Sequence, residues 1–320
     1  MSVPSSNLNQ NLGELLQTEM GADVTFLVSG EHFAAHKNIL AARSPVFKAQ
    51  FFGEMKDKSS PSIEVEGMEA TVFKAMLHFI YTDTVPELDE QGIEAVAAVA
   101  QHLLVAADRE LPLQTIPAEE VPAQPPSTNL HQHLGELLQS GTGADVTFIV
   151  SGESFPAHKD ILSSRSPVFM AGFYGEMEER LSDRVVIVDM EAAAFRAMLH
   201  FIYTDTVPEL DQELQAVATM AQHLLAAADR YGLDMLKLIC EIKLSGGITV
   251  DTAATTLALA EQLNCSQLNC SQLKAKCVDF ILSTPAVLDA VLATEGYKHL
   301  AASCPLVLAD LLKSAHGRKS

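Results

Sequence analysis

Leucines at helical spacing open two separate stretches of the chain. An amphipathic α-helix places residues i, i+3, i+4 and i+7 on one face. The two sets of leucines that follow this rule are Leu8, Leu12, Leu15 and Leu16, and Leu130, Leu134, Leu137 and Leu138. The pattern predicts an amphipathic helix at each place, with its apolar face turned towards a core or a partner.

Short strands follow each predicted helix. The segment from Asp23 to Val28 is rich in β-branched and aromatic residues, a Ser29-Gly30 turn follows, and the pattern resumes at His32. Two such runs joined by a two-residue turn predict a β-hairpin. The same arrangement returns over 145–150, 151–152 and 154–157, and a third strand is predicted over 62–66 and 184–188.

Helices complete each predicted unit. Ser44-Pro45 and Ser166-Pro167 are typical helix starts, because serine caps the first turn and proline fits its first position. Further along, apolar residues at helical spacing predict a longer helix that ends before Thr82. An alanine-rich helix is predicted over 91–107, with its counterpart over 212–228.

These parallels reflect a duplication of the whole unit. Met76–Leu88 reads MLHFIYTDTVPEL and returns unchanged at Met198–Leu210, an offset of 122 residues (198 − 76). A repeat this long is a duplicated domain, because solenoid repeats span roughly 20–50 residues. Each copy holds few strands and several helices, so the predicted fold class is α+β, with two tandem domains. We place the first copy at residues 1–109 and the second copy at 128–231.

A linker and a helical tail complete the predicted organisation. Residues 110–127 contain five prolines, which predicts an extended and stiff linker. The second copy continues into an all-helical region at residues 232–316 that has no counterpart after the first copy. Helices are predicted in this region over 233–243, 252–262, 273–282, 286–293 and 306–314.

Composition and charge exclude some classes of function. The 320 residues are 48% hydrophobic and 19% charged, which is typical of a chain that folds around cores. The net charge of −20 argues against nucleic acid as a partner, because phosphate contacts need clustered Lys and Arg. No apolar run approaches the roughly 20 residues of a membrane-spanning helix, so no membrane partner is predicted. Five cysteines, an odd number without a secretory signal, indicate reduced thiols and a cytoplasmic or nuclear location.

The sequence contains no recognisable catalytic or cofactor-binding motif. Phosphate-binding glycine loops, nucleophile elbows and zinc-protease helices are absent, so neither enzyme activity nor a cofactor is predicted. His36 and His158 follow an apolar strand and precede a lysine, and we interpret them as structural residues.

Two groups of residues leave a choice between chemistry and structure. The first group pairs Asp23 with Lys37 and Asp145 with Lys159, either as a general acid–base pair or as a structural ion pair. The lack of a nucleophile motif favours the ion pair. The second group is Cys265, Cys270 and Cys277, whose spacing matches no paired zinc knuckle, so unligated thiols are favoured over a metal site.

Residues 23–55 and 145–177 resemble the BTB/POZ domain. Both segments contain Asp-Val, Phe-x-Ala-His-Lys and Leu-x-x-Arg-Ser-Pro-Val-Phe in order, and both copies later contain Phe-Ile-Tyr-Thr-Asp. Residues 223–244 and 294–312 are similar to the helical BACK-type tail of speckle-type POZ proteins. The chain as a whole resembles the plant MATH-BTB proteins, without a segment similar to their MATH domain.

This resemblance implies a role in protein ubiquitination. Members of the family bind the cullin of class three through a BTB domain and bring substrates to a RING-type ubiquitin ligase as adaptors. A hydrophobic-x-Glu motif takes part in the cullin contact, and Met177 and Glu179 match it in the second copy. Met55 and Asp57 occupy these positions in the first copy, where the acid is shorter and Lys56 has entered. The second copy is therefore the implied cullin binder.

The resemblance also implies that the BTB domains dimerise. The implied interface residues are Leu12, Leu15, Leu16, Ile39, Asp23 and Lys37 in the first copy, and Leu134, Leu137, Leu138, Ile161, Asp145 and Lys159 in the second. A short tether gives an effective concentration of about millimolar, so we expect the two copies to pair within one chain. Pairing between chains, or with other BTB proteins, fits the same surfaces.

A second function fits the same resemblance. The chain could be a scaffold or decoy that pairs with MATH-BTB relatives without ligase activity. The weakened motif of the first copy favours this alternative, whereas the second copy's motif and the tail favour an adaptor. The substrate protein is not identified by the sequence under either hypothesis.

Overall fold

The structure is a computed structural model that describes residues 6–53, 62–84, 129–175, 182–211, 214–263, 271–307 and 311. These residues fall into two compact units. The paired unit comprises Ser6–Ile187 and Ile202–Asp205, and the helical unit comprises Val188–Phe201 and Thr206–Ser320. The linker predicted over 110–127 and the helix predicted over 91–107 lie outside the described residues. The domain boundaries therefore stay predictions.

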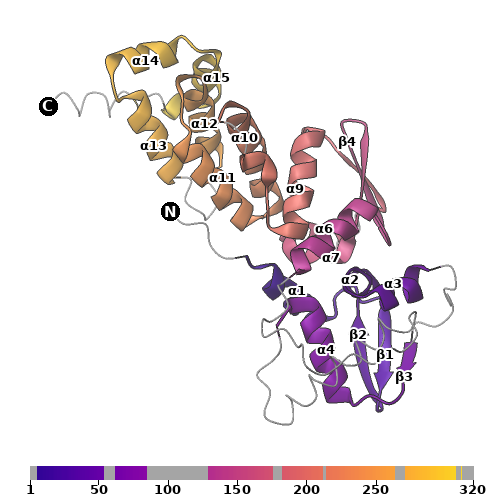
Figure 1. The fold of residues 1–320 in the computed structure, drawn as a ribbon. Coiled ribbons are helices and arrows are strands. Elements are labelled where there is room, and N and C mark those ends of the chain that lie inside the picture. Colours follow the sequence, from indigo (N-terminus) through magenta and orange to yellow (C-terminus); the bar gives the residue numbers. More distant parts are fainter. Residues whose placement is uncertain are drawn as a thin grey trace, which may run out of the picture. The chain divides into compact units, whose positions relative to one another are not determined.

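The paired unit contains the strands and helices predicted twice from the sequence (Figure 1). The elements of the first copy are α1 (Leu8–Thr18), β1 (Val24–Val28), β2 (Glu31–Ala35), α2 (Lys37–Arg43), α3 (Pro45–Phe52), β3 (Ser62–Val65) and α4 (Ala70–Thr82). Those of the second copy are α6 (Leu130–Ser140), β4 (Val146–Val150), β5 (Glu153–Ala157), α7 (Lys159–Arg165), α8 (Pro167–Tyr174), β6 (Arg184–Ile187) and α9 (Ala192–Thr204), whose residues belong to both units.

Each copy is built on a three-stranded sheet. The strand order is β2-β1-β3 in the first copy and β5-β4-β6 in the second, so β1 and β4 are the central strands. The hairpin β1–β2 is antiparallel, as the Ser29-Gly30 turn predicts, and both turn residues adopt positive φ (50° and 84°). The third strand pairs parallel to the first, with α2 and α3 in the crossover. The third strand lies where the sequence pattern places it, whereas its parallel pairing with β1 was not predicted.

Alternation along the central strand builds the core of the first copy. Val24, Phe26 and Val28 point inward and are buried, whereas the residues between them are half-buried. The Phe26 ring lies 5.0 Å from the Phe73 ring of α4, centroid to centroid. The helix therefore covers the sheet face on which the inward residues lie, as Figure 1 also shows.

Serine caps start the second short helix of each copy, as predicted. The Ser44 side chain accepts a hydrogen bond from Phe47 N at 3.4 Å, and Pro45 follows in the first turn of α3. Ser166 accepts from Phe169 N at 3.2 Å at the start of α8. These contacts satisfy amide groups that the first turn of a helix leaves without a partner.

The helical unit contains a bundle of short helices after the last strand. Its elements are the 3₁₀ turn η2 (Pro208–Asp211), α10 (Leu214–Tyr231), α11 (Asp234–Gly246), α12 (Val250–Gln262), α13 (Ser271–Ile281), α14 (Pro285–Leu292) and α15 (Glu295–Ser303). Helix α10 packs on α11, and α12 packs on α13 and α15 around buried Leu257, Leu273 and Leu300. Helix α15 was not predicted, and the helix predicted over 306–314 lies largely outside the described residues.

Candidate interaction surface

The opening helix of each copy is buried along its leucine face. Leu12 is fully buried and Leu15 is 4% exposed, and the equivalent Leu134 and Leu137 are 0% and 5% exposed. Leu16 and Leu138 are half-buried. Part of this face packs on the helix's own domain, since a Cβ on Gly13 would lie 3.1 Å from Thr82 Cγ2 of α4.

The same helices also contact the other copy. Helix α1 of the first copy lies against α7 of the second, and α6 of the second lies against α2 of the first. This reciprocal arrangement is the one expected for two similar domains related by a two-fold axis. Ile39 and Ile161 are fully buried on α2 and α7. The leucines and isoleucines named from the sequence therefore all lie on the four helices that form the contact between copies.

Arg43 links the first copy to the second. Its guanidinium forms an ion pair with Asp83 of its own copy, and the two side chains are 6% and 4% exposed. Arg43 Nη1 also donates to Asn129 Oδ1 at 2.6 Å and lies 3.0 Å from His133 Nδ1 on α6. Asp83 accepts the Leu130 backbone N–H at 3.1 Å, so its carboxylate caps the start of the other copy's opening helix.

Arg165 makes the equivalent contacts in the opposite direction. It pairs with Asp205 of its own copy, and these side chains are 3% and 6% exposed. Arg165 Nη1 donates to Asn7 Oδ1 at 2.6 Å and to Asn11 Oδ1 at 2.5 Å, at the start of α1. Burial lowers the pKa of the Arg165 guanidinium and the Asp205 carboxylate opposes that shift. The arginine remains charged, because its pKa starts far above neutrality.

The two ion pairs were missed in the sequence analysis. Their residues lie in motifs that were quoted there, Arg-Ser-Pro and Tyr-Thr-Asp, but the motifs are 40 residues apart in the chain. No rule of sequence spacing predicts a contact between residues that far apart. The one available signal for these ion pairs was that both motifs occur in each copy.

The turns that follow α1 and α6 also reach the other copy. Gly21 and Gly143 both have φ +79°, a conformation that favours glycine. A Cβ on Gly21 would lie 2.7 Å from Tyr174 Cζ, and one on Gly143 would lie 2.6 Å from Phe52 Cζ. The ends of α3 and α8 thus pack directly on glycine turns of the other copy, without room for a side chain.

In both predicted Asp–Lys pairs, the aspartate side chain accepts a hydrogen bond from the lysine backbone. Asp23 Oδ1 accepts the Lys37 backbone N–H at 2.8 Å, while the two charged ends are 4.0 Å apart and partly exposed. In the second copy Asp145 accepts the Lys159 backbone N–H at 2.8 Å, but the Lys159 ammonium pairs with Asp183 at 2.6 Å. The side-chain ion pair expected for Asp145 is therefore wrong, because Asp183 stands where the first copy has Pro61.

His36 and His158 are structural, as predicted. His36 N donates to the Tyr81 hydroxyl at 2.8 Å, His36 Nδ1 lies 2.9 Å from that oxygen, and Nε2 lies 2.9 Å from the Met20 carbonyl oxygen. His158 repeats the arrangement with Tyr203 and Thr142. Each histidine therefore holds the turn that precedes β1 or β4, which is the turn that contacts the other copy.

The four residues named for cullin binding, Met55, Asp57, Met177 and Glu179, lie outside the described residues. The helices just before them are described. On α8, Val168 and Met170 are 43% and 39% exposed, whereas α3 presents Val46 at 40% and the exposed Lys48. The surface beside the second motif is thus the more apolar of the two.

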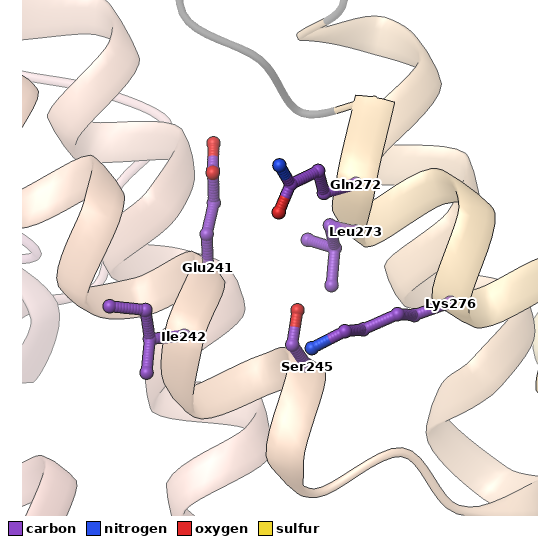
Figure 2. Close-up of a pocket in the computed structure, with 6 residues that line it drawn as sticks. All are labelled: Glu241, Ile242, Ser245, Gln272, Leu273 and Lys276. Carbon is purple, nitrogen blue, oxygen red and sulfur yellow. The ribbon is translucent and has the colours of Figure 1, made fainter. Parts of the chain in front are cut away.

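Two of the hollows among the described residues differ greatly in volume. A groove of about 320 Å³ lies between the copies, where α2 and α3 meet α6. The helical unit has a hollow of about 50 Å³ between α11 and α13, and Figure 2 shows the six side chains that line it. Ligand pockets typically occupy about 300–1,000 Å³, so the hollow is too small for one.

Neither a metal-binding cluster nor a membrane-spanning helix occurs among the described residues. No group of three His, Cys, Asp or Glu side chains there is arranged to hold a metal ion. Cys277 is buried, while Cys265 and Cys270 lie outside the described residues. No helix in the same ranges is both long and apolar enough to cross a membrane.

The fold and the reciprocal contacts define a class of protein: a small α+β interaction domain, present twice and followed by a helical bundle. Comparison with protein families identifies it. The model of the BTB/POZ domain matches residues 12–111 and 134–248, and the BPM/SPOP BACK domain matches residues 252–312. The chain belongs to the BTB/POZ domain family, as its sequence motifs predicted, and carries a BACK domain of the BPM/SPOP type.

Similar proteins agree with this assignment. BTB/POZ and MATH domain-containing protein 3 of Arabidopsis thaliana is 47% identical over 194 residues, covering 59% of this chain and 46% of that protein. Protein 6 of the same series is 38% identical over 203 residues, with 60% and 47% covered. TD and POZ domain-containing protein 4 of Mus musculus is 40% identical over 185 residues, with 58% and 46% covered. The chain thus spans about half the length of these relatives.

A solved structure was also found. The BTB domain of zebrafish PATZ1 is 25% identical, covers 35% of this chain and 85% of that chain, and has a TM-score of 0.29.

Proposed function

We propose that this chain is a non-catalytic adaptor of a cullin–RING ubiquitin ligase. Its second BTB copy binds the cullin three scaffold, and its two copies pair with each other within one chain. The observation that carries the proposal is the BPM/SPOP BACK domain at residues 252–312, directly after the second BTB copy. The combination of BTB and BACK domains is the part of the chain that resembles the ligase adaptors.

The second copy is the better candidate for the cullin contact. By resemblance, Met177 and Glu179 supply the hydrophobic-x-Glu motif, whereas the first copy has Met55 and Asp57 with Lys56 between them. The helix before the second motif presents exposed Val168 and Met170, and apolar side chains favour a protein interface over solvent. Lys48 takes the place of Met170 in the first copy.

Binding of the full chain to the N-terminal region of cullin three tests the proposal. We expect saturable binding, and we expect Glu179→Lys to weaken it at least about tenfold, which corresponds to about 1.4 kcal/mol. Asp57→Lys is the matched control, since it makes a similar charge change at the equivalent position of the first copy, and it should leave the affinity unchanged. Absence of binding, or equal affinity of wild type and Glu179→Lys, would remove the adaptor function.

The competing function is a scaffold or decoy without ligase activity. In this function the chain pairs with MATH-BTB relatives and leaves the cullin unbound. The motif of the first copy favours it, because Lys56 and the shorter Asp57 depart from the family pattern. A chain that captures a MATH-BTB relative but not cullin three would support the decoy, and the opposite result would support the adaptor.

A further inference from the structure

Two equivalent positions at the contact between the copies carry different residues. Asn38 and Asp160 are 122 residues apart, and each is the second residue of its short helix, α2 or α7. Asn38 is 8% exposed and Asp160 is 4% exposed. Asp160 Oδ1 accepts the Ile161 backbone N–H at 2.8 Å, which the start of α7 leaves available. The pair of copies therefore holds a neutral amide on one side and a buried carboxylate on the other.

Both residues lie on helices that contact the other copy: Asn38 on α2, which lies against α6, and Asp160 on α7, which lies against α1. A Cβ on Gly143 would clash with Asn38 Oδ1, so the amide of the first copy touches the glycine turn of the second. Burial raises the pKa of Asp23 in the first copy, and the Asp160 carboxylate raises it further. Burial and Asp160 likewise raise the pKa of Asp145. Since α2 against α6 and α7 against α1 are equivalent contacts, Asn38 and Asp160 hold equivalent places at the contact between the copies, called here the two axial positions.

Two copies can pair as first with second, first with first, or second with second. In the first–second pair, the two axial positions hold the Asn38 amide and the Asp160 carboxylate, so only one carboxylate is present. Two second copies, taken from two chains, would bring two buried Asp160 carboxylates to the equivalent places of one contact, each near Asp145 of its own copy. Two buried carboxylates at close range oppose each other, and burial weakens the screening by water. The mixed pair avoids that opposition.

We propose that Asp160, placed opposite Asn38, makes the pairing selective: a second copy accepts a first-copy surface and rejects another second copy. Selectivity of this kind comes from a repulsive element in the wrong complex as well as from contacts in the right one. The two ion pairs do not supply it, since Arg43–Asp83 and Arg165–Asp205 are equivalent and each forms within one copy. The inference concerns the choice of surface and holds whether or not the second copy binds cullin three.

The test uses the folded full chain with a protease site placed within residues 110–127. After cleavage the two halves are held only by their contact, and native mass spectrometry counts mixed pairs, first–first pairs and second–second pairs after re-equilibration. The measured quantity is the squared amount of mixed pair divided by the product of the two other pairs, for which random pairing gives about 4. We expect the wild type to exceed the random value at least about tenfold.

Three variants separate selectivity from simple weakening. Asp160→Asn and Asn38→Asp each make the two axial positions alike, so each should bring the ratio close to the random value. The double variant Asn38→Asp/Asp160→Asn exchanges the two residues and should keep the ratio of the wild type. A random ratio in the wild type, or a wild-type ratio in either single variant, would overturn the proposal.

A measurement on the uncut chain covers the case in which the halves separate after cleavage. Asn38→Asp places two carboxylates at the two axial positions of the intact chain, so its thermal midpoint should fall below that of the wild type. The double variant restores one carboxylate and should recover most of the loss. If Asn38→Asp and the double variant lose the same amount, the two positions do not act on each other and the inference fails.

Discussion

Arg43 and Arg165 occupy equivalent positions in the two copies, and each reaches from its own copy into the opening helix of the other. Arg43 joins Asp83 to the start of α6, and Arg165 joins Asp205 to the start of α1. Each arginine therefore donates hydrogen bonds across the contact, one from the first copy to the second and one from the second copy to the first. Each is held by a carboxylate of its own domain, so the cross-copy hydrogen bonds are made by a side chain that is already fixed.

Removal of one arginine should destabilise the paired unit. Arg165→Met leaves the buried Asp205 carboxylate without its cation, and removal of one partner of a buried pair costs about 3–5 kcal/mol. We expect the free energy of unfolding of the paired unit, measured by urea denaturation, to fall by about 3 kcal/mol. Arg184→Ala is the control, since this arginine is exposed on β6 and its loss should cost little.

A double variant tests why Arg165→Met lowers the free energy of unfolding. If the cost comes from the uncompensated carboxylate, then Arg165→Met/Asp205→Leu should be less destabilised than the sum of the two single variants. Additive losses would mean that the two side chains contribute independently, and the ion pair would not be the source of the effect.

Glycine turns provide a second test of the contact between copies. Gly143→Ala introduces a Cβ at φ +79° that would lie 2.6 Å from Phe52 Cζ of the other copy. The backbone strain costs about 1–2 kcal/mol, and forced overpacking adds about 1–3 kcal/mol. The free energy of unfolding of the paired unit should therefore fall by the sum of the two costs, about 2–5 kcal/mol.

Gly152→Ala is the matched control for that prediction. Gly152 has φ +84°, but a Cβ there would meet nothing within 4 Å, so the variant carries the strain without the clash. The difference between the two variants isolates the contact with the other copy. Equal losses in Gly143→Ala and Gly152→Ala would show that Gly143 does not pack against Phe52 in solution.

His133 should make the paired unit sensitive to mild acid. Burial lowers the pKa of His133, and the nearby Arg43 guanidinium lowers it further. The unfolded chain therefore takes up the proton at a higher pH than the folded chain does. Stability is complete above the unfolded pKa of about 6.5 and falls as the pH drops below it.

Two exchanges at equivalent positions check this pH dependence. His133→Asn copies the residue that stands at position 11 in the first copy, and it should reduce the loss of unfolding free energy between about pH 7.5 and about pH 5.5. Asn11→His should increase that loss, since it places a second histidine beside Arg165. An unchanged pH profile in His133→Asn would remove the histidine from the explanation.

The buried thiols of the helical unit should resist alkylation. Burial raises the pKa of Cys277 to about 12 and raises the pKa of Cys240 as well, so both remain thiols near neutral pH. The thiolate is the reactive form. Iodoacetamide labelling followed by mass spectrometry should modify these two cysteines only after urea unfolding, and rapid labelling in the folded chain would contradict their burial.

Local features of the fold were predictable because they depend on neighbouring residues. The Ser29-Gly30 turn and the Ser44-Pro45 cap are short-range signals, and both appear where the sequence places them. Leu12 and Leu134 follow from helical spacing alone. The family followed from motifs that occur twice in the same order.

Features that depend on distant residues could not be read in the same way. The parallel pairing of β3 with β1 and the link from Arg43 to Asp83 join segments about 40 residues apart, and no periodicity connects them. The Asp145–Lys159 ion pair was expected by analogy with the first copy, but Asp183 offers the ammonium a nearer partner. Helix α15 was missed because only Leu300 among its residues is buried, which leaves a weak apolar pattern.

The pairing of the two copies within one chain is the central claim, and cross-linking of an isotope mixture tests it most directly. Lys48 of the first copy and Glu136 of the second line the same groove. Equal amounts of light and heavy full chain are mixed, and a short carboxyl-to-amine reagent joins the two residues. The account predicts Lys48–Glu136 links that are light–light or heavy–heavy; light–heavy links in the proportion expected for random pairing, or no link at all, would contradict it.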